Sequence, residues 1–103
     1  RLARYYQHPH PALVYLLAMI VENAARARKP VTLCGEMAGA PGMARLLLSL
    51  GLRRFSMSVP QIAALRETIP ALNCAKLAAH RNAILSAASP ESLQKITEKL
   101  NAA

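Results

Sequence analysis

The fold is decided by residues 31–39, which read Val-Thr-Leu-Cys-Gly-Glu-Met-Ala-Gly. Val31 to Cys34 is a short apolar run without polar alternation, which is typical of a strand buried on both faces in a parallel sheet. Gly35 and Glu36 follow at once, and residues 35–42 are rich in glycine, which predicts a loop. The stretch therefore predicts a buried strand that delivers a cysteine to its carboxyl end.

Helical patterns flank this stretch. Pro11 begins a predicted helix that Lys29-Pro30 ends. A second helix is predicted from Met43 to Leu50, ending at Gly51, and a second strand from Arg53 to Ser58. The first helix should face the core with the apolar positions Leu13, Leu16, Leu17, Ile20, Val21 and Ala24.

Three more helices are predicted after the second strand. Pro60 begins the first of them and Pro70 breaks it, Asn73 is an N-cap for the next, and Ser89-Pro90-Glu91 is a strong start for the last. Their inner apolar positions are Ile62, Leu65 and Ile69, then Leu77, Ile84 and Leu85, then Leu93, Ile96 and Leu100.

Alternating strands and helices indicate an α/β fold with parallel strands and right-handed crossovers. Two buried parallel strands do not make a stable sheet alone. The chain also begins at Arg1 rather than methionine. We therefore expect the remaining strands to come from an N-terminal part of the same polypeptide.

Composition narrows the class of protein. The 103 residues are 53% hydrophobic and 17% charged, which suits one domain with one core. The net charge is +8, but the basic residues are scattered and do not interleave with aromatics, which argues against a nucleic-acid partner. Without a signal peptide or an apolar stretch of bilayer length, we expect a cytoplasmic protein with no membrane partner. The two cysteines form no disulfide framework or metal-ligand spacing, so no metal site is expected in this chain.

Several motifs occur together along the chain: Cys34–Gly39, Leu46–Leu52, Phe55–Ser58, Pro60–Ile62 and the lead-in Tyr6–Val14. In combination they resemble the C-terminal part of the phosphoenolpyruvate-utilising enzyme family. The likeness is greatest to its enzyme I group, from the bacterial sugar phosphotransferase system. The short stretch from Ser58 to Pro60 resembles the fused multidomain members of that group.

The resemblance implies a place in a larger fold. Residues 1–103 would be the C-terminal portion of a phosphoenolpyruvate-binding (β/α)8 TIM barrel, an incomplete barrel followed by two C-terminal helices. Val31–Cys34 would be its seventh strand and Phe55–Met57 its eighth. Barrel enzymes carry their chemistry at the carboxyl ends of strands, which is where Cys34 falls.

The resemblance also implies roles for residues. Cys34 would be the proton donor to carbon 3 of the pyruvate enolate, after the phosphoryl group has passed to an enzyme histidine. A cysteine thiol in water has a pKa of about 8.5, so it is protonated at neutral pH yet able to release its proton. Gly35 and Glu36 would bind substrate, Gly35 by allowing close approach.

The cofactor and partners follow from the same resemblance. They are Mg²⁺ with ligands outside this chain, phosphoenolpyruvate and pyruvate, the phosphocarrier protein HPr, and a second copy in a homodimer through the barrel domain. The substrate arginines, metal ligands and phosphohistidine of the family are missing from these 103 residues. We therefore expect the chain alone to be inactive.

Other interpretations stay open from the residues. Cys34 could be a buried structural thiol, or with Cys74 part of a thiol redox protein. The Cys-Gly-Glu motif also occurs in pyruvate phosphate dikinase, and the charge fits a basic, non-catalytic helical binding module. Cys74 is expected to be structural, and Arg53 and Arg54 to form a solvated rim. His8, His10 and His80 are expected in turns or at the surface, although a His8/His10 metal site is an alternative.

Overall fold

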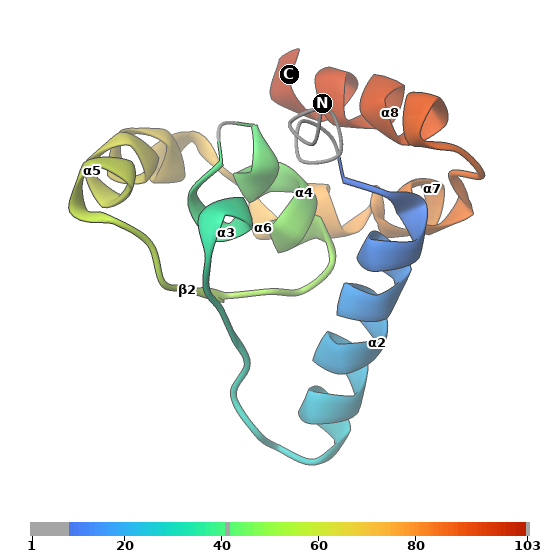
Figure 1. Ribbon diagram of the computed structural model, residues 1–103, viewed down its shortest axis with the longest axis horizontal. Helices are drawn as coiled ribbons and strands as arrows, with labels where there is room; N and C mark the ends of the chain where they lie inside the picture. Colours follow the sequence, from blue (N-terminus) through green and yellow to red (C-terminus); the bar gives the residue numbers. More distant parts are fainter. Residues whose placement is uncertain (1–8, 41, 103) are drawn as a thin grey trace.

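The structure is a computed structural model that describes residues 9–40 and 42–102. Its elements are α2 (Pro11–Arg26), β1 (Thr32–Leu33), α3 (Glu36–Gly39), α4 (Met43–Ser49), β2 (Arg54–Phe55), α5 (Val59–Thr68), the 3-10 turn η1 (Ile69–Ala71), α6 (Cys74–Ala78), α7 (Arg81–Ser86) and α8 (Pro90–Ala102). Helices dominate, and α4 lies among them with α6 and α8 packed against it (Figure 1). The fold is thus mostly helical, with one small sheet.

The sheet consists of β1 and β2, which pair in parallel with Thr32 opposite Arg54 and Leu33 opposite Phe55. The parallel pairing confirms the prediction, although both strands are shorter than expected and β2 ends before Met57. The prediction that the first strand is buried on both faces is wrong. Thr32 and Arg54 are exposed, because only the face that carries Leu33 and Phe55 packs against the core.

The core is centred on α4. Leu46 and Leu47 are fully buried, and they pack with Val14 of α2, Ile84 of α7 and Leu93 of α8. Full burial of one such aliphatic side chain stabilises a fold by about 1.5–3 kcal/mol. The core therefore fixes α4, the helix that connects the two strands.

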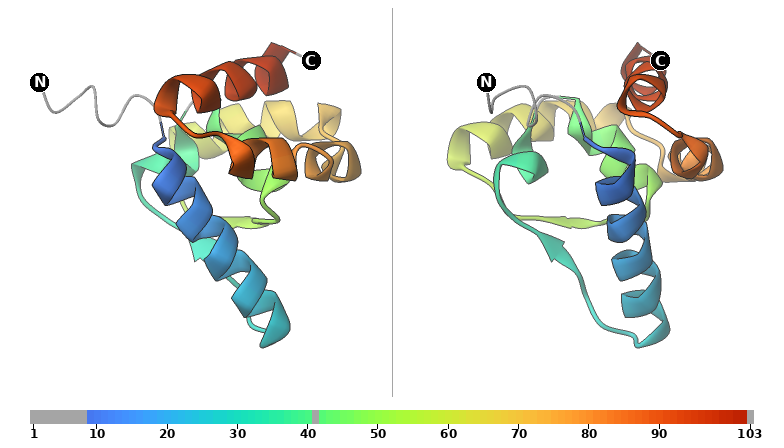
Figure 2. Two further views of the ribbon diagram at one scale, coloured as in Figure 1. Left: turned by 90° about the vertical axis from the view of Figure 1, so that its right-hand side faces the viewer. Right: turned by 45° about the vertical axis from the view of Figure 1, so that its right-hand side comes forward.

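Helix α2 begins as predicted, with Pro11 in its first turn and the Nδ1 atom of His10 accepting a hydrogen bond from the backbone N–H of Ala12 at 3.0 Å. Its predicted stripe is partly wrong. Val14 and Ala18 are buried, whereas Leu13, Leu16 and Ile20 are 36%, 50% and 44% exposed. The helix is apolar around most of its circumference, so spacing alone permits several inner faces. Figure 2 shows its C-terminal end extending away from the other helices.

The helices after β2 begin where the caps predict. Asn73 caps α6 by accepting a hydrogen bond from the backbone N–H of Lys76 at 3.1 Å, and Ser89 does the same for Ser92 at 3.1 Å at the start of α8. The single helix expected after Asn73 is instead two, α6 and α7, separated at residues 79–80. The break lets α6 pack on α4 while α7 packs on α2.

Candidate functional site

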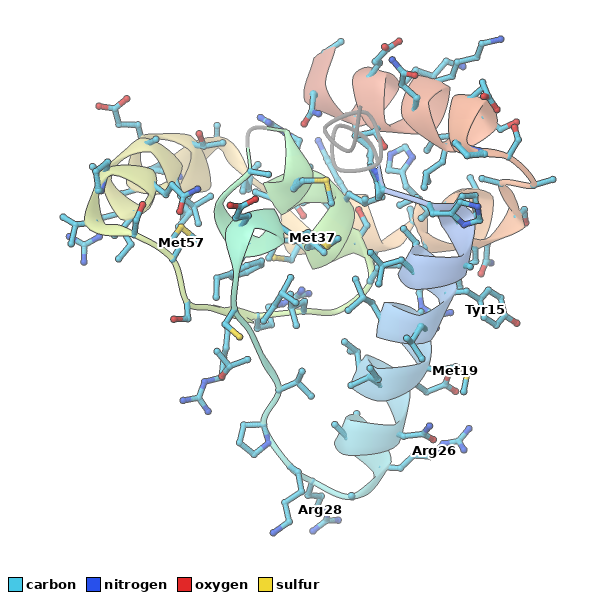
Figure 3. The ribbon with its side chains drawn as sticks, viewed as in Figure 1. Tyr15, Met19, Arg26, Arg28, Met37 and Met57 are labelled. Carbon is cyan, nitrogen blue, oxygen red and sulfur yellow. The ribbon has the colours of Figure 1, made fainter. Side chains whose placement is uncertain are left out.

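Cys34 directly follows β1 and is exposed, with a free thiol. This position at the carboxyl end of the strand agrees with the prediction, and among the described residues the thiol is not buried as a structural core cysteine would be. Figure 3 labels Met37 and Met57, which lie on the segments that follow the two strands, whereas Arg26 and Arg28 lie at the opposite end, before β1. The structure therefore separates a cysteine-bearing end of the sheet from a basic end.

Gly35 turns the chain immediately after the cysteine. Its backbone angles are φ +89° and ψ −174°, a combination that is essentially restricted to glycine. A Cβ atom added there would meet nothing within 4 Å. Glycine is therefore needed at this position for the backbone conformation and not for space.

Glu36 is the exposed first residue of α3, a single helical turn in the segment that was predicted to be a loop. A carboxylate in the first turn is favoured by the free N–H groups of a helix start, which explains the extra turn. Cys34, Gly35 and Glu36 thus form one exposed corner of the chain. The structure also has a pocket of about 500 Å³, lined by Ala38 and residues that follow it in the sequence. Cys34, Gly35 and Glu36 do not line this pocket.

The corner is anchored by the residues that follow it. Ala38 is buried, and a Cβ atom on Gly39 would collide with the side-chain amide of Gln61. Gln61 Oε1 in turn accepts hydrogen bonds from the N–H and the hydroxyl of Ser58, at 3.1 and 3.0 Å, in a capping box at the start of α5. The sequence reasoning missed this contact, although Ser58-x-x-Gln61 is the pattern of a capping box. The segments that follow the two strands are therefore packed together.

The remaining sequence candidates lie elsewhere. His10 and His80 are exposed, at the N-caps of α2 and α7, which confirms their expected surface positions, while His8 is outside the described residues. Cys74 is exposed at the start of α6, so it does not fill the core as a structural thiol would. Over residues 9–40 and 42–102, no three His, Cys, Asp or Glu side chains gather where a metal ion would bind.

Arg53 and Arg54 are exposed before and at the start of β2, as predicted for a solvated rim. Arg53 does more than the prediction assigned to it. Its Nη1 atom donates hydrogen bonds at 2.9 Å to the carbonyl oxygen of Leu48, in the last turn of α4, and to that of Leu52, after the helix. Within the part of the chain that the structure describes, no helix has the length and apolarity needed to cross a bilayer.

Residues 1–74 match the family model described as "PEP-utilising enzyme, PEP-binding domain". Several curated proteins that are similar to the chain carry the name phosphoenolpyruvate-protein phosphotransferase. That of Cupriavidus necator is 44% identical over 82 residues, covering 80% of this chain and 14% of the relative. That of Priestia megaterium is 40% identical over 91 residues, covering 88% and 16%. That of Bacillus subtilis is 36% identical over 91 residues, again covering 88% and 16%.

The chain spans 14–16% of the length of these three relatives. The family match nevertheless covers more than half of the chain and includes both strands and the whole corner from Cys34 to Glu36. The chain therefore belongs to the family of PEP-utilising enzymes.

Proposed function

We propose that residues 1–103 are the C-terminal portion of a (β/α)8 barrel in a phosphoenolpyruvate–protein phosphotransferase. In this proposal β1 is the seventh strand and β2 the eighth, and α4 is the helix between them. The parallel pair joined through a helix is the repeating unit of such a barrel, which supports the assignment. The names of the three relatives favour a phosphotransferase over a dikinase.

The observation that carries the proposal is the position of Cys34, exposed at the carboxyl end of a parallel strand. A histidine nitrogen of the intact protein bonds to phosphorus as the phosphorus–oxygen bond of phosphoenolpyruvate breaks, which leaves an enolate. The S–H bond of Cys34 then breaks, and its proton forms the C–H bond at carbon 3 that completes the methyl group of pyruvate. The resulting thiolate regains a proton from water. In the reverse direction the thiolate is the base.

Gly35 and Glu36 have supporting roles in this proposal. The backbone of Gly35 carries no side chain between the thiol and the substrate, and its conformation directs the chain away into α3. Glu36 lies at the same exposed corner and binds groups of the substrate or of the neighbouring loops. The contact between Gly39 and Gln61 holds this corner against the segment that follows β2.

The intact protein supplies the rest of the machinery. As the resemblance implies, we assign Mg²⁺ to ligands outside this chain and derive no step through it. We further propose that the histidine passes its phosphoryl group to the phosphocarrier protein HPr in sugar uptake, in the cytoplasm. The intact protein would form a homodimer through the barrel domain.

The proposal is tested by isotope exchange in the intact polypeptide. Labelled pyruvate should enter phosphoenolpyruvate through the reverse reaction. Cys34→Ala should slow this exchange by at least about 100-fold, the usual contribution of a positioned acid–base group. Cys74→Ala is the matched control and should stay within about twofold, because Cys74 is an exposed residue at the start of α6 and follows neither strand. Exchange at the normal rate in Cys34→Ala would remove the cysteine from the reaction, and exchange by these 103 residues alone would overturn the assignment of the other groups to the rest of the protein.

A further inference from the structure

A pocket of about 500 Å³ lies between the segment from α3 to α4 on one side and α5 on the other. The side chain of Asn101, from α8, reaches its edge and donates a hydrogen bond to the carbonyl oxygen of Gly42 at 3.0 Å. Small-molecule sites in proteins have volumes of about 300–1,000 Å³ and are mostly apolar with a few polar groups. The pocket therefore has the size of a site for a small organic molecule.

Arg45 is the cation of this pocket. It is half-buried, and within the described residues its guanidinium takes part in no ion pair and donates no hydrogen bond. An arginine has five N–H donors in a planar fork, and those of Arg45 stay open to solvent, because no buried side-chain nitrogen of the described residues lacks a hydrogen-bond partner. It also stands in the first turn of α4, where a positive charge is disfavoured and where no acidic residue accompanies it. No acidic side chain of the described residues is paired with this charge.

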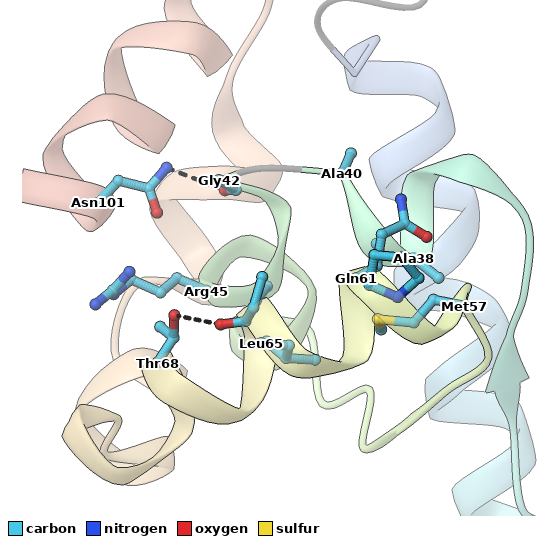
Figure 4. A pocket seen from close by; sticks show the side chains of 13 residues that line it. Ala38, Ala40, Gly42, Arg45, Met57, Gln61, Leu65, Thr68 and Asn101 are labelled. Carbon is cyan, nitrogen blue, oxygen red and sulfur yellow. Dashed lines mark hydrogen bonds between the residues drawn. The ribbon is translucent and has the colours of Figure 1, made fainter.

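The pocket has a polar end and an apolar end. Figure 4 shows Arg45, Thr68 and Asn101 at one end, and Ala38 and Met57 at the other. Thr68 donates its hydroxyl proton to the carbonyl oxygen of Ala64 at 3.4 Å, and Asn101 has a second amide N–H beyond the one that it donates. The polar end thus offers a guanidinium and an amide donor.

We propose that this pocket binds a small amphipathic organic anion. Its carboxylate lies against the guanidinium of Arg45 and the amide of Asn101, and its hydrocarbon part lies along Leu65 toward Met57. A planar guanidinium matches a carboxylate in a two-point, charge-assisted hydrogen bond. This inference does not rest on the proposed activity, and its test measures binding alone.

The probe is octanoate, titrated into the intact polypeptide with isotope-labelled backbone amides while the NMR signals of residues 1–103 are followed. The amides of Leu65, Thr68 and Asn101 should shift along one saturable curve. Octanamide, which has the same shape without the charge, should bind at least about tenfold more weakly, as should octanoate to Arg45→Met.

Two further variants keep the outcome interpretable. Arg66→Met removes an exposed arginine from α5 that does not line the pocket, so octanoate affinity should stay within about twofold. Ala64→Leu fills the pocket from an exposed helical position and should weaken binding by about tenfold even if Arg45→Met fails to fold. Absence of saturation, equal affinity for octanamide, or unchanged affinity in Ala64→Leu would each overturn the proposal.

Discussion

Replacement of Gly35 tests how the chain turns at the cysteine. An L-residue at φ +89°, ψ −174° should cost about 1–3 kcal/mol of native-state free energy. Alanine also lowers the conformational entropy of the unfolded chain, which stabilises the native state by about 0.4–1 kcal/mol and offsets part of this cost. No steric term enters, because a Cβ atom at this position has no neighbour within 4 Å. Gly35→Ala should therefore lower the free energy of unfolding by about 1–2 kcal/mol.

The assay is urea unfolding of the 103-residue chain, followed by circular dichroism, together with a thermal scan. In a domain of this size, the expected loss corresponds to a fall in Tm of about 4–16 °C. The control is D-alanine at position 35, introduced by ligation at the Leu33–Cys34 bond. A D-residue adopts this conformation without strain and also restricts the unfolded chain, so it should leave stability unchanged or raise it.

The comparison between L-alanine and D-alanine at position 35 isolates the contribution of backbone conformation to stability. If the L-alanine chain is as stable as the D-alanine chain, the corner at Gly35 does not have the conformation described, and the reasoning about how Cys34 is presented fails. A loss above about 4 kcal/mol would also contradict it, because that size requires a steric clash or a disrupted core.

Two other predictions concern the packing around α4. Leu46→Ala should lower the free energy of unfolding by about 2–5 kcal/mol, because it leaves a cavity at a fully buried position. Leu13→Ala on the exposed side of α2 should lower it by less than about 1 kcal/mol. Equal losses in the two variants would contradict the core assignment. Asn101→Ala should cost about 0.5–1.5 kcal/mol through the lost hydrogen bond to Gly42, with exposed Asn82→Ala near zero in the same urea titration.

Local signals in the sequence predicted where most elements begin and end. Prolines and capping side chains act within one turn of the backbone, so Pro11, Asn73 and Ser89 could be interpreted without the tertiary structure. The same holds for Cys34, since an apolar run followed by glycine places it at a strand end. These features depend only on neighbouring residues.

Features set by distant parts of the chain were not predicted. Packing against α4 and α7 determines which face of α2 is buried. The break between α6 and α7 lets α6 pack on α4 and α7 pack on α2. The contact of Gly39 with Gln61 and the bond from Asn101 to Gly42 join segments that are far apart in the sequence. The pocket around Arg45 depends on these long-range contacts, so no local sequence pattern predicts it.

The most direct test of the central claim, that Cys34 transfers the proton at carbon 3, is hydrogen exchange at the methyl group of pyruvate. The intact polypeptide is incubated with pyruvate in D₂O, and loss of the methyl proton signal is followed by NMR. We predict exchange by the unsubstituted protein and by Cys74→Ala, and a rate at least about 100-fold lower in Cys34→Ala. Undiminished exchange in Cys34→Ala would contradict the account.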